Sequence, residues 1–131
     1  MAIHLHQSRV YYEDTDMGGV VYHANYLKFI ERGRSDWVRS CGIDQNTLKE
    51  VQGLVFVVRR IAAEFRAPAR LNDLLTVETQ ATEFRGARIL LHQRVLREAT
   101  CLFEADVELA LMTGAGKPTR LPADIRAKLA P

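Results

Sequence analysis

The segment YYEDTDMGGVVYHANYLKFIERGR gathers side chains that can act on an activated acyl group. Two carboxylates stand two residues apart, at Asp14 and Asp16, and are followed by the pair Gly18–Gly19 and by His23. A carboxylate can attack a carbonyl carbon or take a proton from water. Free N–H groups where a glycine-rich loop enters a helix can stabilise an oxygen that becomes negative. This set is sufficient for a thioester, because its thiolate leaves with little help.

Other interpretations of the same residues stay open at this point. Asp14, Thr15 and Asp16 can be turn formers whose side chains bond their own backbone. His23 can be a residue of a helix start without a role in catalysis. Two carboxylates and a histidine can hold a metal ion, but their spacing matches no specific metal site, so we expect no metal and no other cofactor.

Composition narrows the class of protein. A chain of 131 residues with 47% hydrophobic and 26% charged residues predicts one soluble domain, 1–131. The formal net charge of +2 is too balanced for nucleic-acid binding driven by charge. No apolar run reaches the ~20 residues that a membrane span needs, and the N-terminus does not resemble a signal peptide. Cys41 and Cys101 stand too far apart for a disulfide framework, so both are expected to be reduced core residues in a cytoplasmic protein.

One helix and several strands must position the acidic segment. Apolar residues at helical spacing predict a helix over residues 24–41, with Asn25 as its N-cap and Gly42 ending it in a left-handed conformation. Gly33 within this helix suggests close packing on a flat surface, and Arg32 is expected to pair with Asp36. Alternation and β-branched residues predict strands, and a short final helix completes the chain. The expected strands are 3–12, 54–66, 74–84, 88–97 and 101–112, and the final helix is 122–129.

Short connections suggest that the last four strands are antiparallel neighbours. The apolar helix and the half-apolar sheet can bury their faces only against each other, which predicts an α+β domain with the sheet curled around the helix. On the first strand, His4 and His6 are expected to be exposed. His92, on a later strand, is expected to have a hydrogen-bonding partner.

Several motifs together resemble a known family. DTD, GGVVYH and NY between Arg9 and Arg34 are similar to the hydroxybenzoyl-CoA thioesterase family of hotdog enzymes, and within it to the YbgC-type acyl-CoA thioesterases associated with the bacterial Tol–Pal system. LVFVVRR, APARLND, the Arg85–Gly86 turn and KPTRLP extend the similarity over nearly the whole chain. The resemblance implies a hotdog fold, in which a five-stranded antiparallel sheet wraps a long central helix.

The resemblance also implies roles for individual residues. Asp16 matches the catalytic carboxylate, as nucleophile or general base, and the main-chain N–H of His23 would polarise the thioester carbonyl. The side chains of His23 and Tyr12 would assist, and Gly19 would keep the loop tight beside the substrate. The other positions expected at the substrate are Val20, Tyr22, Asn25, Tyr26, Arg59, Arg85 and Arg88.

The coenzyme A contacts depart from the family pattern. The hydroxybenzoyl branch carries a basic cluster after its third strand for the nucleotide phosphates, whereas here Arg85 and Arg88 are separated by two residues without charge. Arg59 and Arg60 are further candidates for these contacts.

The resemblance implies an acyl-CoA substrate and a homodimer or homotetramer with active sites at the dimer interface, and acyl carrier protein is an alternative thioester donor. Two other functions are alternatives. One is a non-catalytic partner of acyl carrier protein or of the Tol–Pal envelope system, which has no need of Asp16. The other is a hotdog enoyl-thioester hydratase, a branch that places a histidine-containing pair differently and lacks the DTD turn.

Overall fold

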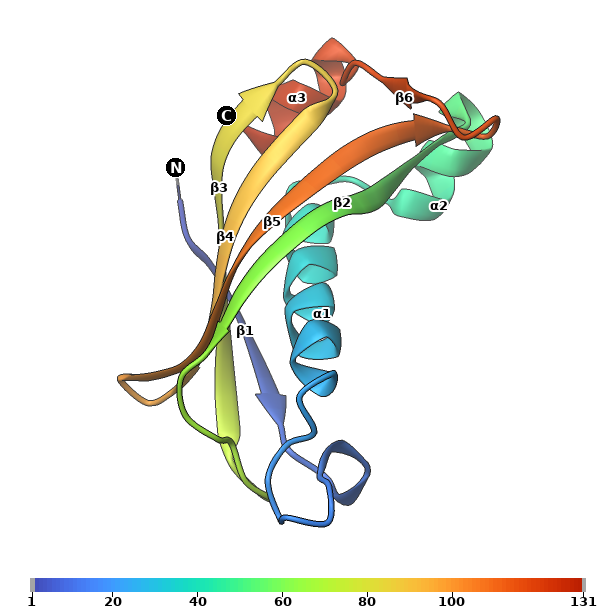
Figure 1. Ribbon diagram of the computed structural model, residues 1–131. Coiled ribbons are helices and arrows are strands. Elements are labelled where there is room, and N and C mark those ends of the chain that lie inside the picture. The colour runs from blue at the N-terminus through green and yellow to red at the C-terminus, as the bar shows by residue number, and fades with distance from the viewer. Residues whose placement is uncertain (1, 131) are drawn as a thin grey trace.

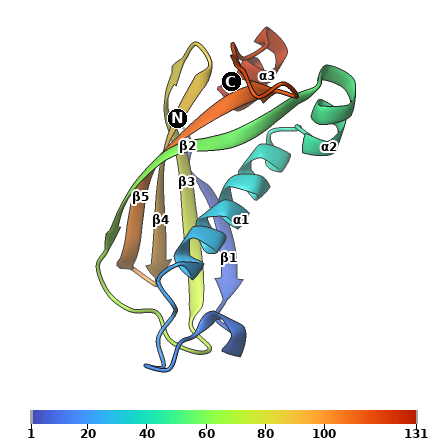
Figure 2. The same cartoon turned by 45° about the vertical axis from the view of Figure 1, so that its right-hand side comes forward.

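The computed structural model describes residues 2–130 as a curved antiparallel sheet that wraps one long helix. Helix α1 (Asn25–Ser40) lies along the concave face of the sheet, as Figures 1 and 2 show from two directions. Within the described residues, none of the helices is long and apolar enough to span a membrane. The expected α+β hotdog arrangement is confirmed.

The strands follow one another in the order β1-β3-β4-β5-β2, with β6 beside β5. The strands are β1 (His4–Arg9), β2 (Leu54–Phe65), β3 (Leu74–Arg85), β4 (Arg88–Arg97), β5 (Thr100–Thr113) and β6 (Pro118–Thr119). The remaining elements are a 3-10 turn (Tyr12–Asp14), α1, a short helix α2 (Gln45–Thr47) that continues into a π-helical turn (Leu48–Gln52), and α3 (Ala123–Leu129).

The core lies between α1 and the inner face of the sheet. Alternate residues of each central strand point toward the helix, because strand side chains alternate between the two faces. Phe29 and Ile30 of α1 are fully buried against this face. The strand residues buried with them include Val77, Ala81, Leu91, Val95, Phe103, Ala105 and Val107.

Helix α1 and the sheet approach each other closely at Gly33, as its place in the sequence suggested. A Cβ atom at this position would lie 2.5 Å from Cγ1 of Val77 and 3.3 Å from Oγ1 of Thr79. Any larger side chain would therefore push α1 away from β3. Gly42, with φ of +84°, ends the helix in the left-handed region, as predicted.

Several sequence predictions about the sheet were wrong in detail. β2 pairs with β5 and not with β3, because the connection 66–73 crosses the end of the sheet and β1 takes the place beside β3. The first strand ends at Arg9 instead of residue 12, because Tyr12–Asp14 form a 3-10 turn. The residues described form six strands, since the two-residue β6 adds to the expected five, and helix α2 was not foreseen.

The histidines of β1 are half-buried, which corrects their expected exposure. They point toward α1, where Nδ1 of His6 bonds the carboxylate of Asp36. Asp36 also accepts a hydrogen bond from Arg39 at 2.7 Å, so the expected pair with Arg32 does not form. His92 has the partner that was predicted, because its Nδ1 lies 2.8 Å from Oδ1 of Asp106.

Cys41 and Cys101 are unpaired and half-buried. Cys41 packs against the core, and burial raises the pKa of its thiol. The prediction that both cysteines are core residues was therefore wrong in detail, since each is half-buried and only Cys41 packs against the core.

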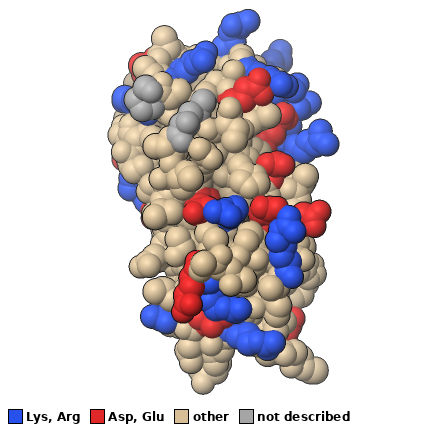
Figure 3. Space-filling model, turned by 90° about the vertical axis from the view of Figure 1, so that its left-hand side faces the viewer, with Lys and Arg blue, Asp and Glu red and all other residues tan. Residues whose placement is uncertain are grey.

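Charged side chains of the sheet pair across neighbouring strands. The guanidinium of Arg94 on β4 lies 2.7 Å from the carboxylate of Glu78 on β3. The guanidinium of Arg59 on β2 lies 2.5 Å from the carboxylate of Glu108 on β5. Over the middle and lower parts of the side shown in Figure 3, basic and acidic side chains interleave.

Candidate active site

The acidic segment forms a small hairpin in front of α1. The main-chain N–H of Asp16 donates to the carbonyl of Val20 at 2.9 Å, and the N–H of Tyr22 donates to the carbonyl of Asp14 at 2.9 Å. Gly19 makes the reversal possible, because its φ of +77° lies in the left-handed region that disfavours side chains. The hairpin therefore fixes the main chain of Asp16 beside Val20, on the segment that leads into α1.

The two carboxylates of the hairpin occupy opposite environments. The Asp14 side chain is buried, with 7% of the residue exposed, and its Oδ2 accepts the N–H of Tyr11 at 2.8 Å. Asp16 is exposed, and its Oδ1 accepts the N–H of Gly18 at 2.8 Å. Among residues 2–130, Oδ2 of Asp16 has no hydrogen-bonding partner. Asp14 is thus a structural carboxylate, whereas Asp16 has an oxygen free to react.

Unbonded main-chain donors lie at the start of α1. Ala24 is the N-cap, so no side chain caps the helix. The N–H groups of Asn25, Tyr26 and Leu27 donate to the carbonyls three residues earlier, at 2.8–3.4 Å. The N–H groups of His23 and Ala24 donate to no acceptor within the described chain. These two donors, at the positive end of the helix dipole, are suited to stabilise a developing oxyanion.

Aromatic rings surround the His23 side chain, which is exposed. The Tyr22 ring lies 4.6 Å from the His23 ring between centroids, and the Phe65 ring meets it edge-on at 6.2 Å. Phe65, at the end of β2, is 55% exposed and was not singled out from the sequence, because a strand-end phenylalanine is typical of a core. Tyr12 is 83% exposed and makes no ring contact with this group among residues 2–130.

Residues 66–73, which connect β2 to β3, hold the hairpin in place through hydrogen bonds. Ala69 is fully buried; its carbonyl accepts the N–H of Val21 at 2.9 Å, and its N–H donates to the hydroxyl of Tyr26 at 3.0 Å. Arg97 donates to the carboxylate of Asp73 at 2.9 Å and so holds the far end of the connection. The hairpin, the helix and this connection consequently form one hydrogen-bonded unit.

Two residues expected at the substrate take part in this hydrogen-bonded support within one chain. Tyr26 is only 3% exposed, its hydroxyl is occupied by Ala69, and burial raises its pKa. Asn25 is 9% exposed and is the first residue of α1 instead of its N-cap; its Nδ2 donates to the carbonyl of Asp14 at 2.9 Å. A sequence cannot distinguish these buried roles from exposed ones, because both side chains have polar ends.

The predicted arginines lie away from Asp16 within one chain. Arg85 and Arg88 flank the β3–β4 turn beside α3, at the end of the sheet opposite the acidic hairpin (Figure 1). Arg85 pairs with Glu83 at 2.8 Å, and Arg88 approaches Glu108 at 3.8 Å. Arg59 shares Glu108 with Arg88, halfway along β2. Of the predicted site, one chain therefore brings together only the residues of the hairpin and helix start.

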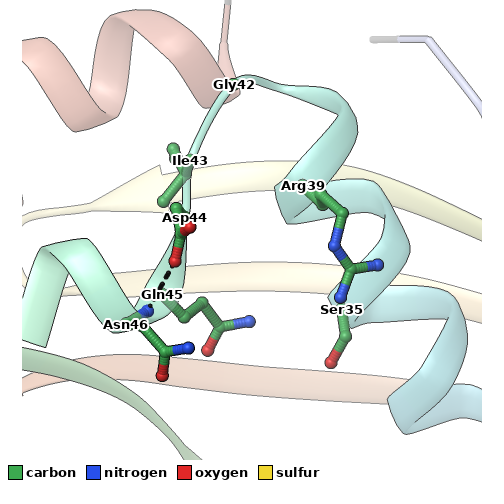
Figure 4. A pocket seen from close by; sticks show the side chains of 7 residues that line it. All are labelled: Ser35, Arg39, Gly42, Ile43, Asp44, Gln45 and Asn46. Carbon is green, nitrogen blue, oxygen red and sulfur yellow. Dashed lines mark hydrogen bonds between the residues drawn. The ribbon is translucent and has the colours of Figure 1, made fainter.

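A polar hollow of about 490 Å³ lies at the C-terminal end of α1 (Figure 4). It is lined by Ser35, Arg39, Gly42, Ile43, Asp44, Gln45 and Asn46. Its charged groups already have partners, since Arg39 binds Asp36 and Asp44 accepts the N–H of Asn46 at 2.9 Å. The hollow includes none of the residues predicted for the site.

Metal-binding side chains do not gather at the hairpin. No group of three or more histidine, cysteine, aspartate or glutamate side chains within residues 2–130 is arranged to hold a metal ion.

Comparison with known proteins identifies the family of this chain. Residues 10–129 match the family model described as the thioesterase-like superfamily. The chain is 48% identical to an acyl-CoA thioesterase YbgC of Haemophilus influenzae, over 91% of this chain and 88% of that one.

Solved structures share the fold. A structure described as a probable thioesterase from Bartonella henselae superposes with a TM-score of 0.90 at 46% identity, over 92% of this chain and all of that one. A 4-hydroxybenzoyl-CoA thioesterase in complex with 4-hydroxybenzoyl-CoA superposes with a TM-score of 0.93 at 21% identity, over 98% of this chain and 99% of that one. At that identity the second comparison concerns the fold alone.

Proposed function

Because this chain belongs to the thioesterase-like superfamily, we propose that it hydrolyses acyl-CoA thioesters to the free acid and coenzyme A, with Asp16 performing the chemistry. One observation carries the assignment to Asp16. Its exposed carboxylate, with one oxygen free, is fixed by main-chain hydrogen bonds in front of a helix start that has two unbonded N–H groups.

In the proposed reaction the thioester carbonyl oxygen accepts the main-chain N–H of His23, which makes the carbonyl carbon more electrophilic. Asp16 then attacks this carbon, the C–S bond breaks, and coenzyme A leaves as a thiolate. Water hydrolyses the resulting anhydride and regenerates the carboxylate. In the alternative route Asp16 takes a proton from water as the water oxygen attacks the same carbon; the C–S bond then breaks, and the coenzyme A thiolate leaves and takes up the proton from Asp16. The exposed side chains of His23 and Tyr12 assist, and the Gly19 turn keeps the loop beside the substrate.

The free edge of β2 supports a homodimer. Every residue from 58 to 66 is exposed except Ile61, which is half-buried, and this stretch includes the apolar side chains of Val58 and Phe65. An apolar edge strand with unpaired main-chain groups favours pairing with another strand. Pairing β2 with its symmetry copy is antiparallel, because a two-fold axis across the strands reverses their direction.

This pairing offers a place for the predicted arginines. Reversal of the second sheet brings its β3–β4 turn to the end at which the first subunit carries Asp16. The partner subunit's Arg85 and the partner subunit's Arg88 then lie at the side of the active site from which the phosphate end of the bound coenzyme A would extend. We propose that each active site combines the acidic hairpin of one subunit with these arginines of the other.

Thiol release from a panel of acyl-CoA thioesters, detected with a thiol-reactive dye, tests the activity. The proposal predicts release in proportion to enzyme for at least one acyl group. Hydration of an enoyl-CoA without thiol release, or binding of acyl carrier protein without hydrolysis of any thioester, would contradict it.

A further inference from the structure

Asn25 joins the helix to the acidic hairpin at both ends of the hairpin. Its main-chain N–H donates to the carbonyl of Tyr22 at 2.8 Å, and its side-chain Nδ2 donates to the carbonyl of Asp14 at 2.9 Å. We propose, on the basis of the proposed function, that Asn25 is a positioning residue that sets the distance between the Asp16 carboxylate and the free N–H groups of His23 and Ala24.

The Asn25 side chain points to the hairpin and not to the first turn of its own helix. Asparagine at a helix start commonly accepts an N–H of the first turn, an interaction worth about 1 kcal/mol. Here the side chain makes no capping hydrogen bond and turns to the hairpin instead. Ala24 occupies the N-cap position and its methyl group accepts no hydrogen bond, so the Asn25 amide serves the hairpin and not the helix start.

The hydrogen bond between Nδ2 of Asn25 and the carbonyl of Asp14 is buried, so it requires a donor at this position. Asn25 is 9% exposed and Asp14 is 7% exposed, so water does not readily replace the amide donor. The carbonyl of Asp14 accepts both Nδ2 of Asn25 and the N–H of Tyr22. Since Asp16 follows two residues later, loss of the Asn25 donor leaves the hairpin strand with the reacting carboxylate joined to Tyr22 but no longer to the side chain from α1.

A purely structural role for Asn25 makes a different prediction, and Gln93 provides the matched control. The Nε2 of Gln93 also donates to a main-chain carbonyl from a buried position, that of Ile30, at 2.9 Å. This hydrogen bond reaches α1 at Ile30, more than one helical turn beyond Asn25, and does not involve the hairpin. Removing either side-chain amide should lower the free energy of unfolding. Only the hydrogen bond from Asn25 ends on the hairpin strand that carries Asp16.

The experiment compares Asn25→Leu with Gln93→Met, two substitutions that keep the length of the side chain and remove the donor. Thiol release is measured below both melting temperatures, on the acyl-CoA that the wild type hydrolyses fastest. Misplacement by about 1 Å costs on the order of 10²-fold, so kcat should fall roughly 10- to 100-fold in Asn25→Leu while KM stays within about threefold. Both constants should stay within about threefold in Gln93→Met. If Asn25→Leu does not fold, Asn25→Ser, which keeps a short hydroxyl donor, supplies the same measurement with a smaller loss.

The outcomes separate the two proposals. An active wild type in which Asn25→Leu keeps its kcat, or loses kcat only as much as Gln93→Met does, overturns the positioning role and leaves the proposed function standing. A wild type that hydrolyses no thioester of the panel overturns the proposed function, and with it the role of Asn25.

Discussion

The hydroxyl of Tyr26, in the first turn of α1, accepts the main-chain N–H of Ala69 at 3.0 Å. Both residues are buried, so this hydrogen bond fastens the connection 66–73 to the helix beneath the acidic hairpin. Tyr26→Phe leaves the Ala69 N–H without an acceptor, which should lower the free energy of unfolding by about 1–3 kcal/mol. Urea denaturation measures the loss.

The control is Tyr22→Phe, because the Tyr22 side chain is 47% exposed and its hydroxyl makes no hydrogen bond within residues 2–130. An equal change in both variants would mean that the Tyr26 hydroxyl does not hold the connection.

The carboxylate of Asp73 should make the stability of the fold depend on pH in the acidic range. Burial alone would raise its pKa, but the N–H of Arg70 and the guanidinium of Arg97 outweigh burial and hold the pKa below its usual range. A carboxylate with a lowered pKa in the folded state stabilises the fold above the unfolded pKa, about 3.9. That stability is lost as the pH falls through the lower, folded pKa.

Melting temperatures measured from pH 6 downward should therefore fall below about pH 4, and Asp73→Asn should weaken this fall and be less stable near neutrality. Glu50→Gln removes an exposed carboxylate as the control. The same acid profile in wild type and Asp73→Asn would show that other carboxylates cause the loss.

Arg85 and Arg88 should affect binding of coenzyme A and not the chemical step. Replacing both with alanine should raise KM for acyl-CoA about tenfold or more, which corresponds to about 1.4 kcal/mol, with kcat nearly unchanged. Arg94→Ala is the control, because Arg94 pairs with Glu78 in the middle of the sheet. An unchanged KM in the double variant would direct attention to Arg59, Arg60 or a lysine.

Mixed dimers test whether these arginines act across the interface. Subunits with Asp16→Asn are combined with subunits carrying Arg85→Ala and Arg88→Ala. If the residues come from different subunits, one site of each mixed dimer has both defects and the other has none, so activity with a low KM returns. Mixed dimers without such recovery would place Asp16 and the arginines in one subunit.

Activity should not depend on a metal ion, since the described residues offer no group of three ligands at the hairpin. Thiol release should persist after dialysis against EDTA. Loss of activity in EDTA that zinc or manganese restores would require a different mechanism.

Local pattern in the sequence predicted the long helix, the strands and the close approach at Gly33, because each depends on neighbours along the chain. The pairing of β2 with β5 was not predicted, because the residues of a strand do not determine which other strand pairs with it. Asp16 was recognised through the DTD turn. Asn25 was expected as a cap at the substrate, because its type suits a helix start, and its bond to Asp14 is a tertiary contact that spacing does not encode.

The central claim is that Asp16, and not Asp14, does the chemistry, and one paired measurement tests it. Asparagine keeps the shape of aspartate but neither attacks a carbonyl well nor takes a proton from water. Asp16→Asn should lower kcat by at least about 10²-fold, with little change in melting temperature because the residue is exposed. Asp14→Asn can still accept the N–H of Tyr11 and should keep kcat within about tenfold. Equal, mild effects of both substitutions, or a large fall in melting temperature for Asp16→Asn, would contradict the account.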